Sequence, residues 1–227
     1  MIRMVVFDMA GTTINEDNVV YKTLQRAVND HGYHFTLDQV MAAGAGKEKK
    51  EAIKSILALR GAHDDESSEE IYKRFIILLH EAYAYLHVRP QAHALELFQK
   101  LKQEKIIVVL NTGYDSKTAN TLIEKLGWIK GETFDDLITA SDVENGRPNP
   151  DMILLAMKQN GIRRTDEVIK IGDSFTDIEE GKNARCALSI GITTGAHSYL
   201  QLTSANPDFV INDLLEIPEI IKNYNQI

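Results

Sequence analysis

The stretch MVVFDMAGTT, residues 4–13, decides the fold class of this chain. Its apolar start is rich in β-branched residues, which predicts a buried parallel strand over residues 2–7. An aspartate, Asp8, follows at once, and a Gly-Thr-Thr turn comes next. Open α/β sheets bind their ligands outside the carboxyl ends of their strands. Asp8 is therefore a candidate site residue, and the alternative is an aspartate that caps a helix.

Strands and helices are predicted to alternate from residue 92 onward. The predicted helices are 92–102, 116–126, 150–159 and 177–185, and the predicted strands are 106–110, 137–140, 168–171, 187–192 and 209–211. Elements of these lengths in this order indicate a doubly wound parallel sheet, which is a Rossmann-like α/β core.

The segment between the first two strands has a helical pattern. Apolar residues recur at helical spacing from Tyr21, and further helices are predicted over 51–59 and 67–86. Thr36 followed by Gln39 is typical of a capping box at the start of another helix. No convincing strand falls in this region. We therefore predict a helical cap over residues 15–87, inserted into a catalytic core formed by residues 1–14 and 88–227.

Charge and composition limit the partners that this chain is expected to bind. Its 227 residues have a net charge of −8, which argues against nucleic acid and against an anionic membrane surface. No apolar run is long enough for a membrane span, and we expect no secretory signal at the start. The single cysteine, Cys186, cannot form an internal disulfide, which favours a cytoplasmic location.

Three later segments place further polar groups at strand ends or in turns. Asn111-Thr112-Gly113 follows one predicted strand, and Arg147 lies in a Gly-Arg-Pro-Asn-Pro turn. Asp173 follows another predicted strand, with Asp177 one helical turn later. The chain thus offers, in this order, a nucleophile candidate, a hydroxyl, a cation and an acidic pair.

These four segments, in this order, resemble the motifs of the haloacid dehalogenase superfamily, and the match spans residues 8–177. The resemblance implies that Asp8 attacks phosphorus and forms an aspartyl-phosphate. Phosphoryl transfer depends mostly on positioning and charge neutralisation. Arg147 is the expected catalytic cation, often paired with the second acidic residue, and the start of the helix at Ser116 is expected to favour an anion. The expected substrate contacts are Gly11, Thr12 and Gly113, with Lys47 of the predicted cap as a further contact. Thr112 and the cap residue Lys49 are expected to be catalytic.

A magnesium ion is the expected cofactor. The Asp8 carboxylate is ionised at neutral pH and needs relief from repulsion by an anionic substrate. Mg²⁺ provides that relief, and it prefers carboxylates, a backbone carbonyl and water as ligands. The expected ligands are Asp8, Asp173, Asp177 and the backbone carbonyl of Ala10.

Ala10 departs from the usual superfamily pattern. Phosphatases of the superfamily carry an aspartate at this position, which protonates the leaving oxygen, and alanine has no proton to give. Asp-x-Ala-Gly-Thr-Thr looks like the phosphonoacetaldehyde hydrolases, or phosphonatases, and their close relatives. There a cap lysine forms a Schiff base with an aldehyde substrate, which makes a carbon leaving group possible.

The predicted cap contains candidates for a lysine of this kind. The family motif has a glycine and, three residues later, a lysine that opens a helix; Gly46 and Lys49 fit it, and Lys47 fits if Gly44 is the reference. A solvated helix start is the alternative for these lysines. Phosphonatases carry Met and His where this chain has Ala45 and Ala52, which favours the related phosphonatase-like group.

Other functions remain open at this point. Within the superfamily, a phosphatase or a mutase-like phosphotransferase without a Schiff base is the alternative. A receiver-like domain would need no cap, and a hydrolytic dehalogenase would need no metal. The expected partner is a small phosphate or phosphonate metabolite, and the protein is expected to be a monomer or a homodimer. The identity of the substrate cannot be predicted.

Overall fold

The computed structural model describes residues 1–45, 47, 49–61, 65–85 and 87–226. The chain divides into two compact units. The α/β unit is Met1–Asn15 with Val88–Ile227, and the helical unit is Glu16–His87.

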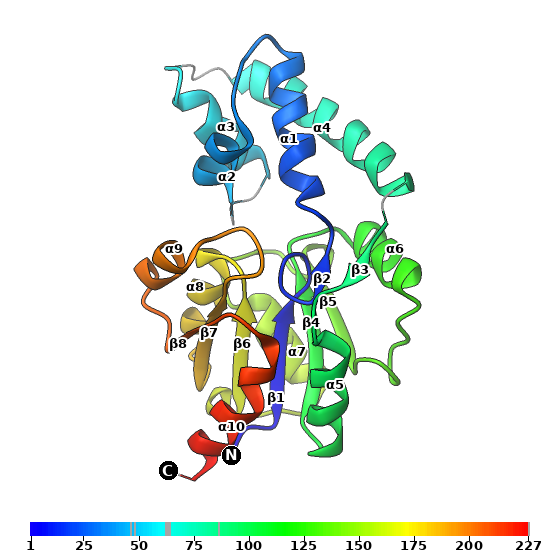
Figure 1. Ribbon diagram of the computed structural model, residues 1–227, viewed down its shortest axis with the longest axis vertical. Coiled ribbons are helices and arrows are strands. Elements are labelled where there is room, and N and C mark those ends of the chain that lie inside the picture. The colour runs from blue at the N-terminus through cyan, green and yellow to red at the C-terminus, as the bar shows by residue number, and fades with distance from the viewer. Residues whose placement is uncertain (46, 48, 62–64, 86, 227) are drawn as a thin grey trace. The chain divides into compact units, whose positions relative to one another are not determined.

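A parallel sheet in the order β5-β4-β1-β6-β7-β8 forms the centre of the α/β unit (Figure 1). Its strands are β1 Met4–Asp8, β4 Ile107–Thr112, β5 Asp136–Thr139, β6 Val168–Gly172, β7 Leu188–Ile192 and β8 Phe209–Ile211. Every residue of β1, β6 and β7 is buried, which explains the nearly continuous apolar runs seen in the sequence. The prediction of an α/β fold with a doubly wound parallel sheet is confirmed.

Helices cover both faces of this sheet, with α5 and α10 in front and α7 and α8 behind in the view of Figure 1. This placement follows from right-handed crossovers between parallel strands. The helices of the unit are α5 Ala94–Gln103, α6 Ser116–Leu126, α7 Asp151–Gln159, α8 Phe175–Asn183, α9 Tyr199–Ser204 and α10 Ile217–Asn225.

Alternate residues of β1 pack on opposite faces of the sheet. Met4 and Val6 belong to the hydrophobic cluster that also contains Ile153 of α7. Phe7 packs on the other face, where its ring lies 5.3 Å from that of Phe98 of α5. Because side chains alternate along a strand, Asp8 continues the face of Met4 and Val6. The nucleophile candidate therefore emerges on the side of the sheet covered by α7 and α8.

The helical unit consists, in its described residues, of helices and connecting turns. Its helices are α1 Val19–Asp30, α2 Leu37–Gly44, α3 Lys49–Ala58 and α4 Asp65–Tyr85. The predicted capping box is present: Thr36 accepts the N–H of Gln39, and the Gln39 side chain accepts the N–H of Thr36. A buried hydrogen bond of 2.8 Å joins Tyr83 of α4 to Glu16.

Short strands connect the α/β unit to the two ends of the inserted segment. β2 Ile14–Asn15 pairs in antiparallel fashion with β3 Arg89–Pro90. Neither strand was predicted, because two residues carry no readable alternation. α9 and α10 were not predicted either, and the predicted helix 67–86 reaches Leu86, which lies outside the described residues.

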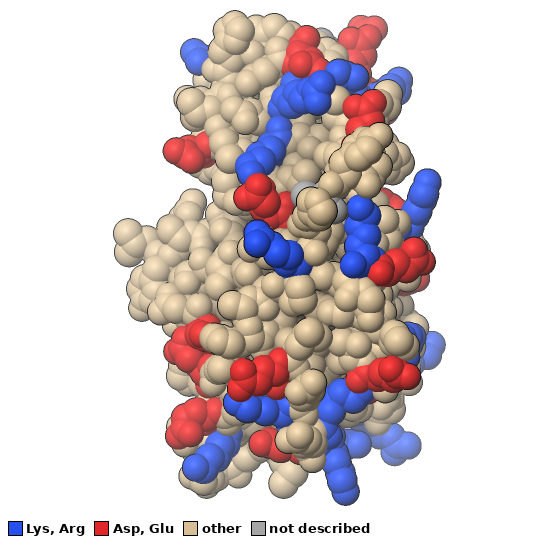
Figure 2. All heavy atoms as spheres, turned by 45° about the vertical axis from the view of Figure 1, so that its right-hand side comes forward, with Lys and Arg blue, Asp and Glu red and all other residues tan. Residues whose placement is uncertain are grey.

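The surface and the helices agree with the charge pattern of the sequence. On the face drawn in Figure 2, Lys and Arg side chains are interspersed with Asp and Glu side chains. Within the part of the chain that the structure describes, no helix is both long and apolar enough to cross a membrane.

Candidate active site

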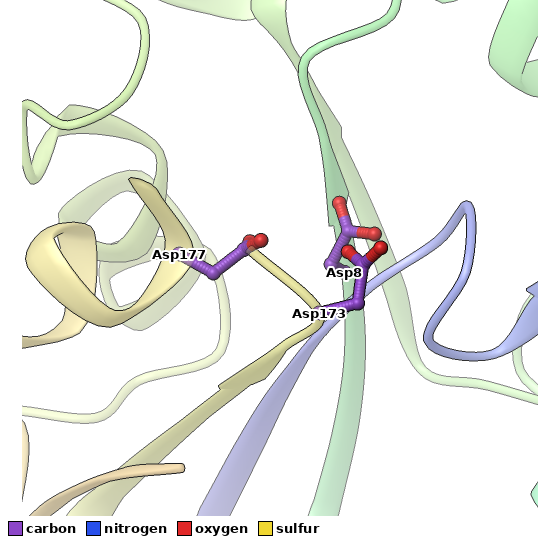
Figure 3. A group of neighbouring side chains, drawn as sticks. All are labelled: Asp8, Asp173 and Asp177. Carbon is purple, nitrogen blue, oxygen red and sulfur yellow. The ribbon is translucent and has the colours of Figure 1, made fainter. Parts of the chain in front are cut away.

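Three aspartate carboxylates converge at the carboxyl edge of the sheet (Figure 3). Asp8 ends β1, Asp173 follows β6, and Asp177 lies in the first turn of α8. One oxygen from each lies within 4.8 Å of the others, and the three side chains are buried. The structure therefore brings together the three carboxylates that the sequence singled out.

Glycines let two loops approach Asp173 closely. Gly11 has φ of +83°, and a Cβ there would lie 2.4 Å from Oδ2 of Asp173. A Cβ on Gly195 would lie 1.9 Å from the same oxygen, and the N–H of Ala196 donates to it at 2.5 Å. Any larger residue at either position would displace this carboxylate. Gly11 thus has a packing role, and its predicted substrate contact stays a prediction.

Arg147 contacts both Asp8 and Asp177. Its Nη1 donates to Oδ1 of Asp8 at 2.7 Å and lies 2.9 Å from Oδ1 of Asp177. Nη2 donates to the side-chain and backbone oxygens of Asn111, and Nε donates to Glu180 at 3.0 Å. The guanidinium thus contacts Asp177, the second acidic residue, which is the pairing that the resemblance implied.

Lys170, Glu180 and Asn111 are site residues that the sequence analysis missed. Lys170 is completely buried in β6, with Nζ 2.7 Å from the side-chain oxygen of Asn111 and 2.9 Å from Asp177. Glu180 is also completely buried and accepts hydrogen bonds from Asn111. A lysine inside an apolar strand, and a glutamate three residues after Asp177 on one helix face, were the available signals.

The buried group is unbalanced in charge. It contains four carboxylates and two cations, so two negative charges remain uncompensated when all six groups are ionised. These groups are Asp8, Asp173, Asp177, Glu180, Arg147 and Lys170. A divalent cation would neutralise this excess, since unpaired buried charge is strongly unfavourable.

Burial and neighbouring carboxylates together raise the pKa values of two aspartates. Burial raises the pKa of Asp8 to about 6, and the neighbouring Asp177 adds to the rise while Arg147 opposes it. Burial also raises the pKa of Asp173 well above its usual range, with contributions from Asp8 and Asp177. Both carboxylates would return to ordinary acidity beside a cation.

Asp177 and Arg147 form the paired half of the site. Burial raises the pKa of Asp177, but Arg147, Lys170 and the Ser174 hydroxyl outweigh it, so that the pKa falls below its usual value. Burial acts to lower the pKa of Arg147, and its carboxylate neighbours more than offset this, so the guanidinium stays protonated. Asp177 also completes the capping box of Ser174 at the start of α8. Asp177 therefore caps α8 and also belongs to the carboxylate cluster.

The donor set fits a hard divalent cation. The oxygens of Asp8 and Asp173 are close together, their pKa values are raised, and Asp177 lies beside them. Carboxylate oxygens are the ligands that Mg²⁺ prefers. Ala10, whose carbonyl was a predicted ligand, lies in the turn two residues past Asp8; its role as a ligand stays a prediction.

The candidate substrate contacts lie in the turns that follow β1 and β4. The hydroxyl of Thr112 accepts the N–H of Tyr114 at 3.1 Å, and Gly113 is exposed with open space around its Cα. The hydroxyl of Thr12 is buried and has no hydrogen-bond partner among the described residues. The roles of Thr12, Thr112 and Gly113 toward the substrate stay predictions.

Asp115 caps the start of α6. Its side chain accepts the N–H and the hydroxyl of Thr118. This carboxylate engages one of the backbone donors of the first turn. The expectation that this helix start favours an anion stays a prediction.

Both candidate lysines, Lys47 and Lys49, belong to the helical unit. Lys47 is exposed and donates to Ser55 at 2.8 Å. Lys49 opens α3, is partly buried, donates to the carbonyl of Lys47 at 3.1 Å, and lies 5.7 Å from the ring of Tyr21. The motif glycine Gly46 lies outside the described residues.

Comparison with known families now identifies the class of this protein. The haloacid dehalogenase-like hydrolase family matches residues 5–190, which is most of the chain. This protein therefore belongs to that family and is an enzyme of the hydrolase class. The resemblance stated from the four motifs is confirmed.

Individual relatives are similar at modest identity. The chain is 26% identical over 225 residues to phosphoglycolate phosphatase of Vibrio parahaemolyticus, covering 97% of this chain and 96% of the relative. It is 26% identical over 261 residues to phosphonoacetaldehyde hydrolase of Latilactobacillus sakei, covering 98% and 96%. A solved structure of a phosphonoacetaldehyde hydrolase-like protein from Oleispira antarctica superposes with a TM-score of 0.82 at 23% identity, covering 99% of this chain and 93% of that one.

Proposed function

We propose that this protein is a Mg²⁺-dependent hydrolase of a small phosphonate or phosphorylated metabolite, and that it acts through an aspartyl-phosphate on Asp8. The observation that supports this most strongly is the meeting of Asp8, Asp173 and Asp177 in one buried group beside Arg147. Family membership supports the same reaction type. The single cysteine favours a reducing compartment, consistent with a reaction in the cytoplasm.

The proposed chemistry has two steps. The carboxylate of Asp8 attacks phosphorus, and the bond from phosphorus to the leaving group breaks. Water then attacks the phosphorus of the aspartyl-phosphate, which releases phosphate and restores the carboxylate. Arg147 holds Asp8 throughout and keeps one of its oxygens oriented, while Thr112 and Gly113 offer a hydroxyl and an N–H toward the phosphoryl group. Asp8, Asp173, the Ala10 carbonyl and Asp177 in support would hold Mg²⁺, which supplies charge neutralisation during the attack.

Ala10 supports the phosphonatase-like assignment within this reaction type. It lies two residues past Asp8, where its methyl group cannot protonate a leaving oxygen. A leaving group that needs no such proton is therefore favoured. In the phosphonatases a carbon leaving group is made possible when a lysine amine condenses with the aldehyde, releases water and forms an imine. Lys49 is the lysine that we propose faces the substrate, and Lys47 is the second choice.

A phosphatase or phosphotransferase without an imine step is the second candidate. The similarity to phosphoglycolate phosphatase extends over almost the whole of both chains. Ala45 and Ala52 replace the residues expected around an imine-forming lysine. In this alternative, Lys49 holds the anionic end of the substrate by charge alone.

A substrate screen tests the proposal. Small phosphate and phosphonate metabolites are incubated with the purified protein, with and without Mg²⁺, and released phosphate is measured. Asp8→Asn is the control, because the amide cannot attack phosphorus and binds Mg²⁺ poorly. We expect Mg²⁺-dependent release that Asp8→Asn abolishes while its circular dichroism spectrum stays unchanged. Release by Asp8→Asn above a few per cent would remove Asp8 from its proposed role.

A further inference from the structure

Arg147 is held not only by Asp8 and Asp177 but also by a set of buried residues. This supporting group consists of Asn111, Lys170 and Glu180. Asn111 is the second-last residue of β4, Lys170 lies in the middle of β6, and Glu180 lies in the second turn of α8. Each of the three side chains is completely buried. Three separate elements of the chain therefore converge behind a single arginine.

The contacts within the supporting group form a closed ring. The amide nitrogen of Asn111 donates to both oxygens of Glu180, at 2.9 and 3.0 Å. The amide oxygen of Asn111 accepts from Lys170 at 2.7 Å and from Arg147 at 2.6 Å. Glu180 lies 3.3 Å from Nζ of Lys170 and accepts Nε of Arg147 at 3.0 Å. Every polar atom of the Asn111 amide is engaged, which fixes its orientation and, through it, the plane of the guanidinium.

Local packing at Gly181 brings α8 close enough for this ring to close. A Cβ on Gly181 would lie 2.4 Å from the hydroxyl of Ser189 and 2.8 Å from Cβ of Lys170. Glycine weakens the interior of a helix, so its presence here needs a packing reason. The close approach of α8 to β6 is that reason, and it places Glu180 directly against Lys170.

A group of buried charges of this kind is not explained by stability. Taking a carboxylate and an ammonium out of water is costly, and apolar residues of similar size often stabilise a core as well or better. The contacts of this group with Arg147 suggest a role in orienting the guanidinium. Asp8 and Asp177 hold one end of the guanidinium, and the supporting group holds the other.

We propose that Asn111, Lys170 and Glu180 are positioning residues that act through Arg147 to orient the carboxylate of Asp8 for attack. Arg147 acts on the nucleophile in this proposal, because Nη1 donates to Asp8 while Nη2 and Nε are held by Asn111 and Glu180. This inference rests on the proposed role of Asp8. A misplacement of about 1 Å at a reacting group can cost about 100-fold in rate, so an indirect effect of this size is large enough to measure.

The test is a double-mutant cycle between Glu180 and Arg147. Glu180→Gln keeps the shape of the side chain and removes its charge, and Arg147→Lys keeps a cation but loses the fork that Glu180 and Asn111 hold. Hydrolysis of p-nitrophenyl phosphate is measured at saturating Mg²⁺ for the unaltered protein, both single variants and the double variant. Asp136→Asn is the matched control, because Asp136 is a buried carboxylate paired with Lys130 that makes no contact with the ring described above.

We expect Glu180→Gln to lower kcat about tenfold or more, while KM and the half-saturating Mg²⁺ concentration change less than about threefold. In the Arg147→Lys background the same substitution is expected to change kcat less than about threefold, since interacting residues are non-additive. Asp136→Asn is expected to lower the thermal midpoint and leave kcat unchanged. An equal loss from Glu180→Gln in both backgrounds would overturn the positioning role.

Two further measurements keep the result decisive. If Glu180→Gln does not fold, Asn111→Ser replaces it in the cycle, because it removes the amide that orients Arg147. If Arg147→Lys turns over too slowly, the cycle is measured as the affinity for beryllium fluoride at saturating Mg²⁺, because beryllium fluoride mimics a phosphoryl group on a carboxylate. Asp8→Asn is assayed beside the cycle. Full activity of that variant would overturn the proposed function itself, whereas an inactive Asp8→Asn with an additive cycle would overturn the positioning role alone.

Discussion

The affinity of this protein for Mg²⁺ is expected to decrease steeply as the pH is lowered from neutrality to about 5. The pKa of Asp8 is raised to about 6 by burial and by Asp177. Below that pH the metal-free protein holds a proton on Asp8, and Mg²⁺ must displace it. At about pH 5 roughly ten of every eleven molecules carry this proton, so the apparent dissociation constant should be about 11-fold higher than at about pH 8. Asp173, whose pKa is also raised, adds to this factor.

Isothermal titration calorimetry in two buffers of different ionisation enthalpy measures both the affinity and the protons released. We expect about half a proton to leave Asp8 per Mg²⁺ bound near pH 6, more below that pH, and almost none from Asp8 near pH 8. The pKa of Asp177 is lowered, so it adds no proton in this range. Asp136→Asn should show the same pH dependence as the unaltered protein. A dissociation constant that stays the same from about pH 5 to about pH 8 would refute the placement of Mg²⁺ at Asp8 and Asp173.

Three further predictions concern the metal, the helical unit and the turn after β1. Asp173→Ala should lower the affinity for Mg²⁺ by more than about 10- to 100-fold, which is the usual loss when a residue that only supports a metal ligand is removed. Unchanged affinity by calorimetry would contradict the assignment of Asp173 as a ligand. Lys49→Arg should keep most activity, because imine formation needs a neutral, buried amine and Lys49 is only partly buried. A borohydride adduct mapped to Lys49 in the presence of an aldehyde phosphonate would show the opposite. Ala10→Asp should raise turnover of alkyl phosphates relative to aryl phosphates, since general acid help is worth about 100- to 10,000-fold. Fast, equal turnover of both esters by the unaltered protein would mean that another residue supplies the acid.

Much of the α/β unit could be predicted from local patterns. Buried parallel strands such as β1 and β6 read as apolar runs, and Gly127 ends α6 with φ of +65°, as a glycine after a helical pattern indicates. β2 and β3 could not be predicted, because each is two residues long and exists only through its pairing with the other. α10 was not predicted, although its apolar residues have helical spacing.

In the site, too, some residues could be predicted from the sequence and others could not. Asp8, Asp173 and Asp177 could be predicted because each follows a strand or begins a helix at the carboxyl edge, where ligands bind. The direction of Arg147 could not, because a turn residue between two elements has no fixed orientation in the sequence, and its partners come from β1, β4 and α8. Lys170 in an apolar strand was a readable signal, but its partners follow only from the register of the sheet.

We expect phosphorus to become bonded to Asp8 during turnover. Acid quench of the protein during reaction with an activated aryl phosphate and Mg²⁺, followed by mass spectrometry of its peptides, tests this directly, because acyl phosphates survive brief acid exposure. One phosphoryl group is expected on the peptide that contains Asp8, and it is expected to be absent in Asp8→Asn and absent without Mg²⁺. A phosphoryl group on another residue, or rapid turnover by Asp8→Asn, would rule out Asp8 as the residue that is phosphorylated.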